Sequence, residues 1–102
     1  MEPVRKLSRS IRGKVALVTG AASGMGRATA HVFADEGAKV AVIDLKQDRV
    51  DAVVKEIEAA DGEAAGWALD VADGEGIVRV VKEVGERFGG LDILVNNAGL
   101  AT

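Results

Sequence analysis

Four short apolar segments alternate along the chain with three longer segments whose apolar residues recur every three or four positions. The short segments span residues 14–19, 39–43, 63–69 and 91–95. Short apolar runs of this kind are typical of strands that are covered on both faces. We therefore predict four strands, although Ala64, Ala65 and Gly66 give the third one residues that are poor strand formers.

The three longer segments have the apolar spacing of amphipathic helices. Glycines or an Asp-Gly pair follow each of them, and Asp73 is placed to cap the start of the last one. The predicted inward faces are Met25, Ala28, Val32 and Phe33 within 25–36, then Val50, Val53, Val54 and Ile57, and finally Ile77, Val80, Val81, Val84 and Phe88.

The resulting element order is β-α-β-α-β-α-β, which predicts an α/β fold with a parallel sheet and right-handed crossovers. Pro3 is the only proline, and no linker interrupts residues 13–102, so we predict one domain there. Residues 1–12 carry four basic groups and one acid but no apolar core, so we interpret them as a solvated basic extension and not a secretory signal.

Composition and charge exclude several classes of protein. The sequence has no cysteine, which rules out disulfides and thiolate metal sites and is compatible with a reducing compartment, so we expect a cytoplasmic location. No apolar run approaches the length of a membrane span, so we expect no membrane partner. Beyond residue 12 the chain is acidic and has few aromatic residues, which argues against a nucleic-acid partner.

A glycine-rich loop, residues 19–26, follows the first predicted strand and opens the first predicted helix. In this context Gly20 allows a tight turn, Gly24 lets a pyrophosphate approach the backbone, and Gly26 lets the helix lie close to the sheet. The free N–H groups and the dipole of the helix start would then hold the phosphates. Taken alone, the same pattern is also compatible with a glycine-rich turn that binds nothing.

Asp44 ends the second predicted strand, 24 residues after Gly20. A carboxylate at this position can accept hydrogen bonds from both hydroxyls of an adenosine ribose, and it would repel a 2′-phosphate. Neither Ser23 nor Leu45 is basic, so the sequence favours NAD over NADP. The alternative is an aspartate that only caps the following helix.

Two further polar segments end strands at the same edge of the predicted sheet. Asp70 and Val71 follow the third strand, where they could hydrogen-bond an adenine, and Asn96-Asn97-Ala98-Gly99 follow the fourth. Ordinary turns are the alternative interpretation, although a turn accounts less easily for two consecutive asparagines.

Together these motifs resemble the classical short-chain dehydrogenases/reductases over residues 13–102. The resemblance implies a Rossmann-type half domain with strand order 3-2-1-4, ending after the fourth strand, and an oxidoreductase that interconverts an alcohol and a carbonyl with NAD. It also implies roles for individual residues. Those near the pyrophosphate are Gly20, Ser23, Gly24, Met25 and Gly26; those near the adenosine are Asp44, Asp70 and Val71; those bordering the ribose and nicotinamide portions are Asn96, Ala98 and Gly99; and Thr19 and Asn97 support the site.

The catalytic residues of that family are not matched. The family uses a Tyr-x-x-x-Lys pattern beyond the Asn-Asn-Ala-Gly segment, whereas this chain has no tyrosine. His31, the only histidine, is expected at a surface or half-buried helix position away from the ligand edge. We therefore assign no catalytic residue and expect the 102-residue chain to be inactive alone.

Three interpretations of the whole sequence follow. The first is a fragment of a longer oxidoreductase, which we expect to be a homo-oligomer in its full-length form and to act there on a small-molecule substrate. The second is a non-catalytic nucleotide-binding or interaction module. The third is a methyltransferase that uses S-adenosylmethionine, which would leave the pyrophosphate-type loop without a purpose.

Overall fold

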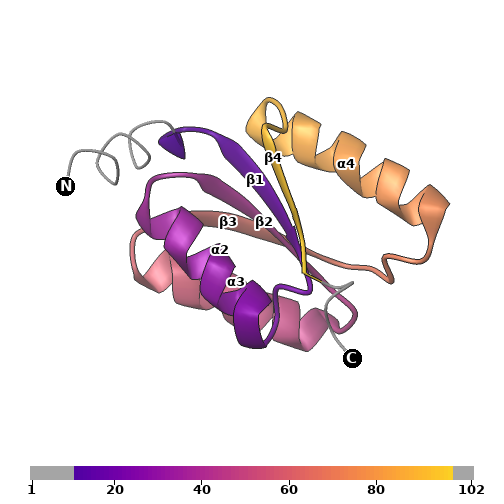
Figure 1. The fold of residues 1–102 in the computed structure, drawn as a ribbon, viewed down its shortest axis with the longest axis horizontal. Coiled ribbons are helices and arrows are strands. Elements are labelled where there is room, and N and C mark those ends of the chain that lie inside the picture. The colour runs from indigo at the N-terminus through magenta and orange to yellow at the C-terminus, as the bar shows by residue number, and fades with distance from the viewer. Residues whose placement is uncertain (1–10, 98–102) are drawn as a thin grey trace.

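A computed structural model describes residues 11–97 (Figure 1) and contains the predicted alternation of strands and helices. The helices and strands agree with the predicted segments to within a few residues. In chain order they are β1 (Val15–Thr19), α2 (Gly24–Asp35), β2 (Lys39–Asp44), α3 (Gln47–Ala59), β3 (Glu63–Ala68), α4 (Gly74–Phe88) and β4 (Ile93–Asn96).

The four strands form one parallel sheet in the order β3-β2-β1-β4, which confirms the predicted order. Thr19 at the end of β1 is in register with Ile43 of β2 and with Asn96 of β4. Because all strands run in the same direction, their carboxyl ends lie at one edge of the sheet. The loops that carry the predicted site residues therefore meet at that edge.

The helices cover the two faces of the sheet unequally: α2 and α3 lie on one face, and α4 lies on the other (Figure 1). Parallel sheets are normally buried on both faces, which explains the apolar strands. The core under α2 and α3 includes Val18, Val40, Val42, Val50, Val53 and Ile57, and the core under α4 includes Leu17, Ala41, Ile43, Val80, Val84 and Phe88.

The predicted inward face of α2 is wrong except at Phe33, which is partly buried and packs against the core. Met25 is 70% exposed, Val32 is 55% exposed and Ala28 is also exposed, while the buried residues of the helix are Gly26 and Ala30. The helix turns its smallest residues toward the sheet because a Cβ at position 26 would lie 1.9 Å from the carbonyl oxygen of Gly20. Such close packing leaves Met25 and Val32 on the outer side of the helix.

The other two helices follow the predicted pattern more closely. Val50, Val53 and Ile57 of α3 are fully buried. On α4 the residues Val80, Val84 and Phe88 are buried, but Val81 is 38% exposed, so the prediction that Val81 faces inward is wrong. Asp73 caps α4 as predicted, since its Oδ1 accepts a hydrogen bond from the Gly76 N–H at 3.1 Å. None of the helices within residues 11–97 is long and apolar enough to cross a membrane.

Candidate functional site

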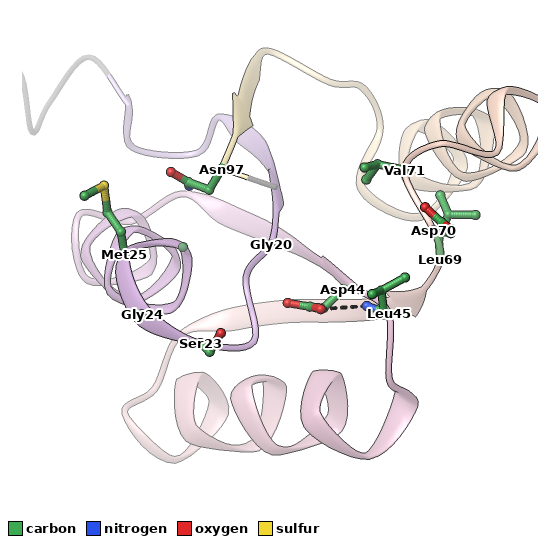
Figure 2. A pocket seen from close by; sticks show the side chains of 11 residues that line it. Gly20, Ser23, Gly24, Met25, Asp44, Leu45, Leu69, Asp70, Val71 and Asn97 are labelled. Atoms are coloured by element: carbon green, nitrogen blue, oxygen red, sulfur yellow. Dashed lines mark hydrogen bonds between the residues drawn. The ribbon is translucent and has the colours of Figure 1, made fainter. Parts of the chain in front are cut away.

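A cavity of about 540 Å³ opens at the carboxyl edge of the sheet, and most of the predicted site residues line it (Figure 2). The start of α2 borders one side, and the turn after β3 borders the opposite side. The lining residues are Gly20, Ser23, Gly24, Met25, Gly26, Asp44, Leu45, Leu69, Asp70, Val71 and Asn97.

The glycine loop adopts the conformation that its sequence predicts. Gly20 and Gly24 have positive φ angles of 62° and 57°, which residues other than glycine rarely adopt. Ser23 precedes α2 in an extended conformation, and its side chain makes no capping hydrogen bond. The first N–H groups of α2 are therefore available to an anion at the cavity wall, where the helix dipole also favours negative charge.

Asp44 connects β2 to the glycine loop. Its Oδ2 accepts a hydrogen bond from the Ala22 N–H at 2.8 Å, and its Oδ1 accepts one from the Leu45 N–H at 2.7 Å (Figure 2). The N-cap of α3 is Lys46, so Asp44 does not cap that helix, and this alternative interpretation is wrong. A carboxylate oxygen has two lone pairs, so Asp44 can still accept hydrogen bonds from a ligand in the cavity.

Asp70 and Val71 lie across the cavity from the glycine loop (Figure 2). The Asp70 Oδ1 accepts a hydrogen bond from the Ala72 N–H at 2.9 Å, which stabilises the turn after β3. Both Asp70 and Val71 remain exposed. Asp70 can thus stabilise the turn and still face a ligand in the cavity, as predicted from the sequence.

The two consecutive asparagines at the end of β4 lie in different places. Asn96 accepts a hydrogen bond from the Thr19 hydroxyl at 2.7 Å and lies outside the cavity, in a groove between β4 and α4. Asn97 lines the cavity, and its side-chain Nδ2 is buried without a hydrogen-bond partner among the described residues. Ala98 and Gly99 lie outside the described residues.

His31 lies on α2 and is not among the residues that line the cavity. Its side chain is half-buried, as expected, and its Nε2 lies 2.8 Å from Oε1 of Glu56 on α3. Arg27 forms a bidentate pair with the same carboxylate. The hydrogen bonds from Arg27, and to a smaller extent the one with His31, lower the pKa of Glu56 to about 2. Sequence reasoning did not find this cluster, because nothing in the local sequence relates Glu56 to a helix some 25 residues earlier.

The site has no arrangement suited to a metal ion. Among residues 11–97 no three or more histidine or carboxylate side chains are grouped closely enough to hold one. The polar groups that meet at the cavity are backbone N–H donors, carboxylate acceptors and an amide, which suit a polar organic ligand with an anionic portion.

Comparison with known proteins decides the family. Residues 14–102 match the family model described as short chain dehydrogenase. The chain belongs to the short chain dehydrogenase family. It is 46% identical over 90 residues to the 3-oxoacyl-(acyl-carrier-protein) reductase FabG of Thermotoga maritima, covering 88% of this chain and 37% of that protein. It is 45% identical over 89 residues to the D-threitol dehydrogenase of Mycolicibacterium smegmatis, covering 87% of this chain and 34% of that protein.

Solved structures of the family agree with the fold. The L-sorbose reductase from Gluconobacter frateurii, complexed with NADPH and L-sorbose, has a TM-score of 0.84 and 42% identity, covering 90% of this chain and 35% of that one. The hydroxysteroid dehydrogenase from Escherichia coli has a TM-score of 0.82 and 35% identity, and the match covers 84% of this chain and 37% of that one. This short chain dehydrogenase sequence thus spans little more than a third of its relatives' length.

The residues present fit a nicotinamide dinucleotide. The close contact between Gly26 and Gly20 brings the start of α2 against the end of β1, so that Gly24, Met25 and Gly26 line the cavity. The buried Nδ2 of Asn97 is a donor that a ligand oxygen can satisfy, and a buried donor without an acceptor is costly.

Proposed function

We propose that residues 13–102 form the dinucleotide-binding half of an oxidoreductase that uses NAD(H) to interconvert an alcohol and a carbonyl group. The observation that carries this proposal is the convergence at one cavity of the glycine loop, Asp44, the Asp70-Val71 turn and Asn97. These residues come from four separate loops that the parallel sheet brings to one edge, and their combined chemistry suits a common ligand.

In this proposal the pyrophosphate binds at the start of α2, where Gly24, Met25 and Gly26 present their N–H groups beside Ser23. Asp44 accepts hydrogen bonds from the adenosine ribose, and Asp70 and Val71 contact the adenine. Asn97 donates to the bound cofactor, while Ala98 and Gly99 keep the roles that the family resemblance implies. Asn96, which lies outside the cavity, supports the site through its hydrogen bond with Thr19. When bound, the cofactor supplies or accepts the hydride.

The preference for NAD rests on the charge of Asp44. A 2′-phosphate on the ribose would be repelled by this carboxylate, and Leu45, the next residue in the cavity wall, offers no compensating cation. The related L-sorbose reductase is complexed with NADPH, so the cofactor choice has to be argued from this chain's own residues.

Catalysis and substrate recognition need groups that this sequence does not contain. The chain has no tyrosine to act as the family's general acid, so we expect the 102 residues to bind the cofactor without turning it over. We also expect a full-length form to act on a small molecule as a homo-oligomer. A cysteine-free sequence is compatible with a reducing compartment, and we expect the cytoplasm.

The replacement Asp44→Ala tests the proposal. We expect it to weaken NADH binding by about 1–3 kcal/mol, because charged hydrogen bonds to the ribose are lost, and to reduce the discrimination against NADPH. Titration calorimetry with both cofactors measures this. Asp48→Ala removes an exposed carboxylate from the first turn of α3 and is the matched control, which should bind like the wild type. Unchanged NADH affinity in Asp44→Ala contradicts the assignment.

A further inference from the structure

The first turn of α2 would hold the pyrophosphate, yet no capping side chain fixes the start of this helix. Ser23 makes no side-chain cap, and the Arg27 N–H reaches the Ser23 carbonyl at 3.3 Å, which is long for a helical hydrogen bond. A donor array that binds an anion well has to be held in place before the anion arrives. The groups outside α2 that hold its first turn in place should therefore affect how tightly this turn binds the pyrophosphate.

Two such supports belong to the cavity already described. Gly26 lies against the Gly20 carbonyl, and the Ala22 N–H donates to Asp44. On the side facing α3, however, a hollow of about 330 Å³ separates the glycine loop from that helix. Its lining includes Ser23 and Gly24 on one side and Ala52 and Val53 on the other, so α3 does not support the loop there by apolar packing.

The Glu56 carboxylate bridges this hollow. Its Oε1 accepts from Arg27 Nε at 2.9 Å and lies 2.8 Å from His31 Nε2, and its Oε2 is 2.6 Å from the second guanidinium nitrogen. Arg27 and His31 are four residues apart, so they lie one above the other on the same side of α2. One carboxylate on α3 thus holds a full turn of α2 both in position and in rotation about the helix axis.

We infer that Glu56 is a positioning residue for pyrophosphate binding: it fixes the first turn of α2 through Arg27 and His31 without touching the cofactor. This inference rests on the proposed dinucleotide site. Glu56 and Arg27 line the hollow but not the cavity where the cofactor would lie. Asp44 and the Asp70-Val71 turn lie on other elements and make no contact with Glu56 among the hydrogen bonds described, so the effect of Glu56 should be largest for phosphate-bearing ligands.

The experiment compares Glu56→Gln with Glu58→Gln in the full 102-residue chain. Both variants remove one carboxylate charge from the same helix, but Glu58 lies in a different surface hollow, beside β3 and α4. Calorimetric titrations use ADP, NADH and adenosine, and far-UV circular dichroism establishes that each variant is folded. If Glu56→Gln fails to fold, Arg27→Lys replaces it, because an ammonium cannot form the bidentate pair.

We expect Glu56→Gln to weaken ADP and NADH binding about three- to fivefold, the upper range for an exposed ion pair, and to leave adenosine binding unchanged. Glu58→Gln should match the wild type with all three ligands. Three outcomes overturn the inference alone: equal behaviour of the two variants, an equal loss for adenosine and ADP, or tighter ADP binding once Arg27 is released. A wild-type chain that binds neither ADP nor NADH overturns the proposed function, and this inference with it.

Discussion

Two helices cover one face of the sheet, whereas a single helix covers the other. On α3, the core residues Val50 and Ile57 are completely inaccessible to solvent. Beside α4 an apolar groove of about 260 Å³ stays open, and Leu94 of β4 is 65% exposed in its wall. The core under α2 and α3 is thus closed by its own helices, apart from the hollow beside the glycine loop, and the face next to β4 is not closed within residues 11–97.

The two faces of the sheet therefore contribute differently to the molecule. The closed face supports the phosphate loop, since α2 carries the loop and α3 holds α2. The open face combines exposed apolar side chains with β4, an edge strand in the described sheet. Exposed apolar surface next to an unpaired strand edge favours association with other protein segments.

The strongest test of the comparison places the same substitution on each face. Ile57→Ala on α3 should destabilise the chain by about 2–5 kcal/mol, because it empties a closed core. Ile77→Ala on α4 should cost clearly less, because Ile77 is only partly buried and lines the open groove, where solvent replaces the lost atoms. Urea unfolding followed by circular dichroism measures both values.

The midpoint and the slope of each unfolding curve have to be compared separately, since only a shift at constant slope reports stability. Equal losses from the two substitutions would show that the groove beside α4 is as closed as the core under α3, and the comparison would be wrong.

Sequence patterns predicted the fold where large apolar residues make the core. On α3 and most of α4, branched and aromatic side chains occupy the inward positions, so periodicity identified the buried face correctly. On α2 the sheet is approached by Gly26 and Ala30, and hydrophobic periodicity gives little weight to residues this small. The exposed Met25 and Val32 therefore produced a false inward face.

The candidate site divides in a similar way. The positions of the glycine loop, Asp44 and the Asp70-Val71 turn at one edge follow from parallel topology and could be predicted. The contrast between Asn96 and Asn97 could not, because it depends on the register of Asn96 with Thr19 at the end of β1. The Glu56 bridge between α2 and α3 likewise depends on how two helices distant in sequence lie together.

A second test compares two glycines. A Cβ at Gly66 of β3 would lie 2.2 Å from Cγ1 of the buried Val50, so Gly66→Ala should overpack the closed face and cost about 1–3 kcal/mol. At Gly85 of α4 nothing lies within 4 Å of an added Cβ, so Gly85→Ala should stabilise the helix by up to about 1 kcal/mol. Thermal unfolding by circular dichroism gives the sign of each change, and a destabilised Gly85→Ala would mean that α4 is covered there.

The last test concerns association through the open face. The exposed groove and the edge of β4 predict that the 102-residue chain self-associates. Leu94→Lys should weaken this about tenfold, or about 1.4 kcal/mol, since a lysine on an edge strand opposes pairing and an apolar contact is lost. Val32→Lys makes a similar change at an exposed site on α2, across the sheet, and should have little effect. Sedimentation equilibrium distinguishes the two variants, and equal weakening would mean that association does not select the face that α4 leaves open.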